Sequence, residues 1–204
     1  MVTRGAAIVL SDKEVESWKG DYYFLPLVGV KGKNKSSLRV CFDASRRQGG
    51  YPSMNDCLRK GPDRFLNNLL AVQICFCNGR VGCIADISKF HNQVHLEEVD
   101  VHMQRFLLRN MNTSAKPQVY AVKVNNFGVK PANCIATLAL QKSADMFKDI
   151  YPVESEELKT QTYIDDELLA AEDKEHAVLK TSRIDEILLH AGMPNKGWTY
   201  TGDD

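Results

Sequence analysis

The 204-residue sequence has no long hydrophobic run and no net charge, since 26 Lys and Arg residues balance 26 Asp and Glu residues. No stretch approaches the roughly 20 consecutive apolar residues that a transmembrane helix needs. The start, Met1-Val2-Thr3-Arg4, lacks the long apolar core of a signal peptide. We therefore expect an intracellular, cytoplasmic protein with no membrane partner.

The neutral balance also argues against a surface that binds nucleic acid by bulk electrostatic attraction alone. The charges are nevertheless unevenly distributed, because the stretch from Lys31 to Arg64 is mainly basic and the stretch from Glu154 to Glu175 is mainly acidic. A basic front and an acidic middle would suit a template and nucleotide on one side and metals on the other. Two unrelated solvated faces are the alternative.

The six cysteines show no zinc-binding pattern. Cys75 and Cys77 have one residue between them, instead of the two to four that are usual for zinc, so we expect no structural zinc. Cys41, Cys75, Cys83 and Cys134 lie within apolar runs, which predicts reduced thiols packed in the core.

Two adjacent carboxylates lie in Tyr163-Ile164-Asp165-Asp166, between two stretches that are compatible with β-strands. Because Asp is a turn former, this segment predicts a hairpin that carries both acids at its tip. An ordinary polar turn is the alternative.

A third acid, Asp86, ends the apolar run that begins at Val81 after an Asn78-Gly79 turn signal, and this run predicts a buried strand. An unpaired buried carboxylate is costly, so two strands that both end in acid indicate a divalent-metal site. Paired metals of this kind can clamp a phosphoryl group.

Several stretches resemble motifs of reverse transcriptases, and they follow one another in the order in which that family has them. Some of them resemble the BEL/Pao retrotransposon branch. Asp86-Ile87-Ser88-Lys89 and Tyr163-Ile164-Asp165-Asp166 resemble the two acidic palm motifs, and Phe127-Gly128-Val129-Lys130-Pro131 resembles the glycine-containing motif between them. The stretches that resemble the BEL/Pao branch are Leu38 to Ser45, Ser53 to Leu58 and Met103 to Leu107.

The resemblance implies an α+β fold: a ferredoxin-like antiparallel palm sheet with helices on one face, plus a fingers hairpin. Residues 1–204 would form one domain, mainly fingers over 1–80 and mainly palm over 81–204, ending near the primer-grip motif. The thumb and ribonuclease H regions would belong to a longer polyprotein, in a cytoplasmic retroelement particle.

The resemblance also implies an RNA-directed DNA polymerase that uses deoxynucleoside triphosphates, a primer and an RNA or DNA template. Asp86 and Asp165 would bridge two Mg²⁺ ions, or Mn²⁺, with Asp166 in a lesser role and the Ile87 carbonyl as a further ligand. Lys196 is a candidate general acid for the leaving pyrophosphate.

The nucleotide side would be formed by residues of the fingers and of the glycine loop. Arg39 matches the family arginine that contacts the triphosphate, with a strand-edge ion pair to Asp43 as the alternative. The other expected nucleotide-binding residues are Lys33, His91, Phe127 and Gly128. In many relatives a proline follows soon after the glycine of this loop. Here the proline comes later, at Pro131, which would change the contacts of the loop with the nucleotide.

His91 departs from the family, which usually has Phe or Tyr five residues after the first acid to block the ribose 2′-hydroxyl. The alternative is that His91 faces solvent while Phe90 packs in the core. His91 and His95 are four residues apart and would face one another on a helix, but no third ligand supports zinc.

The remaining pattern predicts the scaffold. Ser11 and Glu14 form a capping box for a helix that Gly20 would end. A hairpin, with strands over 27–30 and 38–42, precedes a helix from Asp63 through Phe76. Strands over 101–108 and 119–124 would extend the palm sheet. Helices from Pro131 to Tyr151 and from Asp173 to Gly192, and a short β-segment over 197–202, complete the chain.

Two other functions are compatible with these patterns. The chain could be a catalytically inactive, truncated remnant that folds and binds only nucleic acid or protein, although it retains all three acids. An RNA-templated RNA polymerase palm would use the same metals, but it does not account for the stretches from Leu38 to Ser45 and from Ser53 to Leu58.

Overall fold

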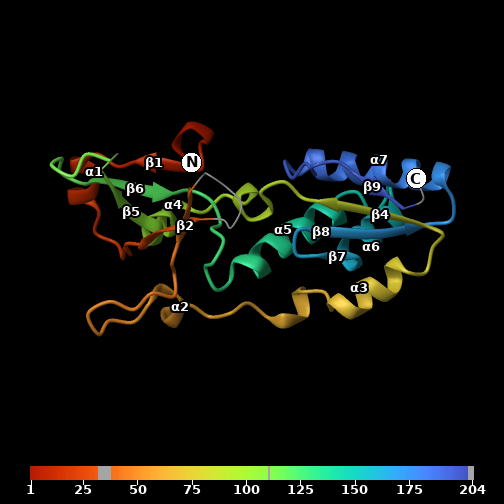
Figure 1. Cartoon of the computed structure of the whole chain (residues 1–204), viewed down its shortest axis with the longest axis horizontal. Helices are drawn as coiled ribbons and strands as arrows, with labels where there is room; N and C mark the ends of the chain where they lie inside the picture. The colour runs from red at the N-terminus through yellow and green to blue at the C-terminus, as the bar shows by residue number, and fades with distance from the viewer. Residues whose placement is uncertain (32–37, 110, 202–204) are drawn as a thin grey trace. The chain divides into compact units, whose positions relative to one another are not determined.

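The computed structural model describes residues 1–31, 38–109 and 111–201 (Figure 1). The chain divides into two compact units, each made of two separate stretches. Unit 1 comprises Met1–Lys60 and Val94–Ala132, and unit 2 comprises Gly61–Gln93 and Asn133–Asp204. No helix among the described residues is both long enough and apolar enough to cross a membrane. The predicted single domain, with fingers over 1–80 and palm over 81–204, stays a prediction.

Unit 1 contains a three-stranded antiparallel sheet with the strand order β1-β6-β5. Its strands are β1 (Ala7–Val9), β5 (Arg105–Leu108) and β6 (Gln118–Val122). The prediction that the last two strands extend the sheet of Asp86 is wrong, because β5 pairs with β6 and β6 pairs with β1 instead. The strand predicted from Val101 begins only at Arg105, since a short helix, α4 (Glu98–Val101), and a 3-10 turn (His102–Gln104) precede it.

The predicted hairpin of unit 1 is confirmed: β2 (Leu27–Lys31) pairs antiparallel with β3 (Leu38–Phe42). The capping box is confirmed as well, because the Glu14 backbone N–H donates to Ser11 Oγ and the Ser11 backbone N–H donates to Glu14 Oε2. The helix that it opens, α1 (Asp12–Ser17), ends before Gly20. The remaining helices of unit 1 are a 3-10 turn (Val2–Arg4) and α2 (Met54–Cys57).

Unit 2 is organised around a four-stranded sheet with the order β7-β8-β4-β9, in which all pairings are antiparallel. Its strands are β4 (Val81–Asp86), β7 (Thr162–Tyr163), β8 (Asp166–Ala171) and β9 (Thr199–Tyr200). Along the chain they follow the order strand, helices, strand, strand, helix, strand. Strand alternation leaves Cys83 and Leu169 fully buried, whereas Ile84 on the other face is 40% exposed.

The long helix of unit 2 is α7 (Lys174–His190), which packs against β4 and β8. Asp173 caps it as predicted, by accepting the His176 backbone N–H at 2.8 Å. α5 (Ala132–Asp145) also agrees with the prediction, but it ends earlier than expected. A separate helix, α6 (Pro152–Thr160), follows and was not predicted, although Pro152 lies at its first turn.

The helix predicted from Asp63 begins later, because Asp63 opens only a 3-10 turn (Asp63–Phe65). Asn68 caps the α-helix itself, α3 (Leu69–Phe76). Two apolar side chains of α3, Leu70 and Ile74, are 65% and 60% exposed. The helix is apolar on every side except at Gln73, so packing one side, at Val72, leaves other apolar side chains uncovered.

The expectation that helices cover only one face of the sheet does not hold for α3. Gly82 points to the opposite face from Cys83, and a Cβ atom at Gly82 would lie 2.5 Å from the Phe76 ring. The thiol prediction holds only in part: Cys83 and Cys134 are buried, whereas Cys41 and Cys75 are exposed. All six cysteines are free thiols.

Candidate active site

The three acids predicted from the sequence meet at one end of the unit 2 sheet. Asp86, the last residue of β4, lies directly opposite Asp166, the first residue of β8. Asp165 occupies the turn between β7 and β8, where Ile164 has a positive φ of 59°. The Ile87 backbone N–H donates to the Asp165 carbonyl at 2.8 Å, which ties this turn to the end of β4.

The acids influence one another electrostatically. The pKa of the Asp166 carboxyl is raised, first by burial and then by the negative charges of Asp165 and Asp86. The positive charge of Lys196 acts in the opposite direction. The cluster therefore favours added positive charge.

Lys196 contacts Asp86 through both its backbone and its side chain. Its backbone N–H donates to the Asp86 carbonyl at 2.9 Å, and its ammonium group forms an ion pair with Asp86 Oδ1. The residues on either side also pair. The Ser88 backbone N–H donates to the Pro194 carbonyl at 2.9 Å, and Asn195 forms a β-bridge with Ile87. The Lys196 side chain is therefore fixed at its base beside Asp86.

Glu167, which sequence reasoning missed, is a fully buried carboxyl directly behind the acidic turn. Burial, followed by the negative charge of Asp185, raises the pKa of the Glu167 carboxyl to about 8. Asp185 itself accepts hydrogen bonds from Asn195 Nδ2 at 2.5 Å and Trp198 Nε1 at 2.9 Å. Alternation along β8 could have identified Glu167, because it occupies the same face as the buried Leu169.

His91 is 7% exposed, so the alternative that it faces solvent is wrong. Its Nε2 lies 2.7 Å from Asn133 Oδ1, at the start of α5. Phe90 is 1% exposed and packs in the core, as that same alternative predicts. His91 lies in a 3-10 helix (Phe90–Gln93) of unit 2, whereas His95 lies in unit 1. The two histidines therefore do not share a helix as a ligand pair.

The other predicted nucleotide-binding residues belong to unit 1, except that Lys33 lies outside the described residues. Arg39 is exposed on β3, opposite Val30. Phe127 is 73% exposed, and Gly128 has a φ of 92°, a conformation that favours glycine.

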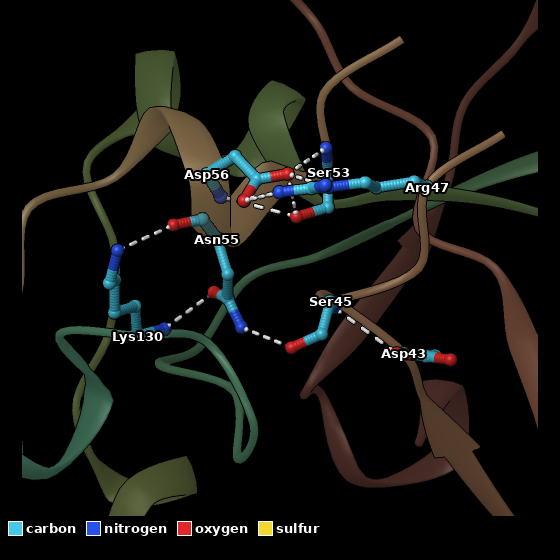
Figure 2. A network of polar contacts seen from close by, with 7 residues as sticks. All are labelled: Asp43, Ser45, Arg47, Ser53, Asn55, Asp56 and Lys130. Carbon is cyan, nitrogen blue, oxygen red and sulfur yellow. Dashed lines mark hydrogen bonds and ion pairs between the residues drawn. The ribbon is translucent and has the colours of Figure 1, made fainter. Parts of the chain in front are cut away.

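Asn55 holds this glycine loop in place, which the sequence did not reveal. Its Nδ2 donates to the Gly128 carbonyl at 2.9 Å and to Ser45 Oγ at 3.0 Å, and its Oδ1 accepts the Lys130 backbone N–H at 2.8 Å. The Lys130 ammonium group donates to the Asn55 carbonyl at 2.9 Å. Figure 2 shows the contacts of Asn55 with Ser45 and Lys130.

Asp56, the next residue of α2, anchors the helix itself (Figure 2). Arg47 donates to its carboxylate through two nitrogens, at 2.8 and 2.9 Å, and Ser53 completes a capping box with it. The side-chain hydrogen bond from Arg47 and those from Ser53 hold the pKa of the Asp56 carboxyl well below its usual range. This bidentate geometry fixes the position from which Asn55 reaches the loop.

We predict that Asn55→Ala destabilises the chain by about 1–2 kcal/mol, because three side-chain hydrogen bonds are lost. Ser45→Ala, which removes only one partner of Asn55, should cost below about 0.5 kcal/mol. Urea unfolding of both variants measures the difference. Equal losses of stability in the two variants would contradict the role assigned to Asn55.

The acidic cluster fits a divalent metal in its donor chemistry, although the described residues contain no group of three or more side chains already gathered around a metal position. Carboxylate and carbonyl oxygens are the ligands that Mg²⁺ prefers. Burial, followed by the negative charges of Asp165 and Asp86, raises the pKa of Asp166, and a divalent cation would relieve the repulsion among these charges. Asp86, Asp165, Asp166 and the Ile87 carbonyl are the residues that would hold it.

Comparison with protein families gives one match. The family model described as reverse transcriptase (RNA-dependent DNA polymerase) matches residues 44–195, which is more than half of the chain and includes all three acids. Comparison with curated proteins gave no match.

Proposed function

Because the chain belongs to the reverse transcriptase (RNA-dependent DNA polymerase) family, we propose that it extends a primer 3′-hydroxyl with deoxynucleotides through two metal ions held by Asp86 and Asp165. The family's reaction is nucleotidyl transfer, with a template, a primer and deoxynucleoside triphosphates as substrates. The observation that carries the proposal is the pairing of Asp86 opposite Asp166 with Asp165 in the adjoining turn.

Unit 2 would be the core of the palm. Its four-stranded antiparallel sheet and its order of strands and helices are those of a ferredoxin-like fold, which supports this assignment. The hairpin of β2 and β3 would belong to the fingers. On the basis of motif resemblance, we also propose that the chain belongs to the BEL/Pao branch and acts in a retroelement particle. Thumb and ribonuclease H regions of a polyprotein would accompany it there.

Each acidic residue has a proposed role. Asp86 and Asp165 hold both ions, Asp166 contributes mainly charge, and the Ile87 carbonyl adds one oxygen. Bound Mg²⁺, or Mn²⁺, supplies activation of the primer hydroxyl and neutralisation of the triphosphate. Lys196 is placed next to Asp86, where its ammonium group could protonate the leaving pyrophosphate.

The nucleotide would be bound by the exposed Arg39 on β3, by Lys33 and by the loop of Phe127 and Gly128. A guanidinium group binds phosphate oxygens in a bidentate manner, which suits a triphosphate. Asn55 would serve this site indirectly, because it fixes the Gly128 carbonyl.

Primer extension on an RNA template with Mg²⁺ tests the proposed function, with the chain as given and with a version extended by a thumb. Template-dependent DNA synthesis by either protein supports it. Binding of primer and template with no synthesis by either protein would favour the inactive remnant. A preference for ribonucleotides would favour an RNA polymerase.

We predict that His91→Phe increases the ratio of deoxynucleotide to ribonucleotide incorporation, if His91 occupies the position that faces the ribose. Phenyl is bulkier than imidazole and cannot hydrogen-bond a 2′-hydroxyl. Asn133→Ala is the matched control, because it frees the His91 ring without adding bulk and should not raise the ratio. An unchanged ratio in His91→Phe would show that discrimination is set elsewhere.

A further inference from the structure

Lys196 faces two demands that conflict. Its ammonium group is paired with Asp86, yet Asp86 is one of the two proposed bridging ligands of the metals. A lysine has no acceptor and cannot share that carboxylate oxygen with a cation at the same position. Lysine and metal must therefore compete for Asp86.

We propose that Lys196 is a resident counter-ion of the acidic site, which pairs with Asp86 until a divalent metal ion displaces it. This inference rests on the proposed function, because it takes Asp86 as a metal ligand. The proposal specifies an order of events, in which the ammonium group leaves the Asp86 carboxylate before the divalent ion binds it.

The geometry makes this exchange feasible at low cost. The Lys196 side chain is 59% exposed and that of Asp86 is 38% exposed, although Asp86 Oδ1, the oxygen that pairs with Lys196, is itself buried. Exposed ion pairs contribute at most about 1 kcal/mol. The ammonium group belongs to a mostly exposed side chain, so it can leave into water while the incoming ion takes its place at the Asp86 oxygen.

The backbone keeps the displaced lysine nearby. The Lys196 N–H donates to the Asp86 carbonyl at 2.9 Å, and the bridge between Asn195 and Ile87 fixes the preceding residue. Only the side chain needs to move, so the ammonium group stays within one side-chain length of the metals. From there it could reach the leaving pyrophosphate, which links its displacement to its proposed proton transfer.

Electrostatics explain why a resident cation is useful. Asp86 lies opposite Asp166, with Asp165 in the adjoining turn, so three like charges meet beside the Lys196 ammonium group. The ammonium group thus reduces repulsion among the acids while no divalent ion is bound. It also lowers metal affinity, because each bound ion must first break the pair.

The test measures Mn²⁺ affinity by electron paramagnetic resonance on the full chain, with Lys196→Met and without nucleotide or primer. We expect Lys196→Met to bind Mn²⁺ about fivefold more tightly, which corresponds to the loss of an exposed ion pair. Polymerase turnover should fall in the same variant, since a proton donor is lost. Metal affinity and turnover would then change in opposite directions, which a purely structural role would not produce.

Lys148→Met is the matched control, because it makes the same change in net charge at an exposed position of unit 2. Its Mn²⁺ affinity should equal that of the wild type. Unchanged or weaker binding by Lys196→Met, or an equal gain in Lys148→Met, would overturn the inference. Failure of the proposed function looks different: Asp86→Asn and Asp165→Asn would then leave Mn²⁺ affinity unchanged.

Discussion

Asp165→Asn should lower DNA synthesis by about a thousandfold, while the chain stays folded. The amide keeps the size and turn preference of Asp165 but removes the charge that holds the metals. Metal ions supply several kcal/mol of transition-state stabilisation, and a loss of about 4 kcal/mol corresponds to three orders of magnitude in rate. Primer extension under single-turnover conditions measures the effect.

Stability separates this effect from misfolding. Asp165 is one of the charges that raise the pKa of Asp166, so its removal relieves repulsion, and the melting temperature in a chelator should stay level or rise. Asp149→Asn, at an exposed position between α5 and α6, is the matched control and should retain full activity. Synthesis at the wild-type rate by Asp165→Asn would rule out its role as a metal ligand.

The acidic end of the sheet was predictable because local signals agree there. The turn preference of Asp165, the apolar run that ends at Asp86 and the motif order all indicate one arrangement, and the register places Asp86 opposite Asp166.

The parts that failed depend on long-range pairing or on burial. Nothing local in Arg105–Leu108 indicates that its neighbour β6 pairs with β1, so its sheet was assigned wrongly. The apolar α3 carries no periodicity that identifies its exposed side, so the sequence does not indicate that Leu70 is exposed. Asn55 escaped notice because its main partner, Gly128, is 73 residues away in sequence.

Glu167 provides the clearest pH dependence, since its carboxyl is fully buried behind the acidic turn. Its pKa is raised from an ordinary 4.5 to about 8 in the folded chain. Between these two values the folded state keeps a proton that the unfolded state has released. The protonated Glu167 side chain therefore contributes its full share to the free energy of unfolding below about pH 4.5. This contribution is lost as the pH rises through the folded-state pKa of about 8.

Glu167→Gln should consequently stabilise the chain by about 3 kcal/mol at pH 7, because the amide carries no charge to neutralise. The gain should shrink by about 1.4 kcal/mol for each pH unit below that and vanish near pH 4.5. Urea unfolding at pH 5, 6 and 7 in a chelator measures the trend. Glu172→Gln removes an exposed carboxyl from the same unit and should follow the wild-type pH dependence. Parallel stability curves for Glu167→Gln and the wild type would show that Glu167 is ionised in the folded chain, and that Asp185 and burial do not retain its proton.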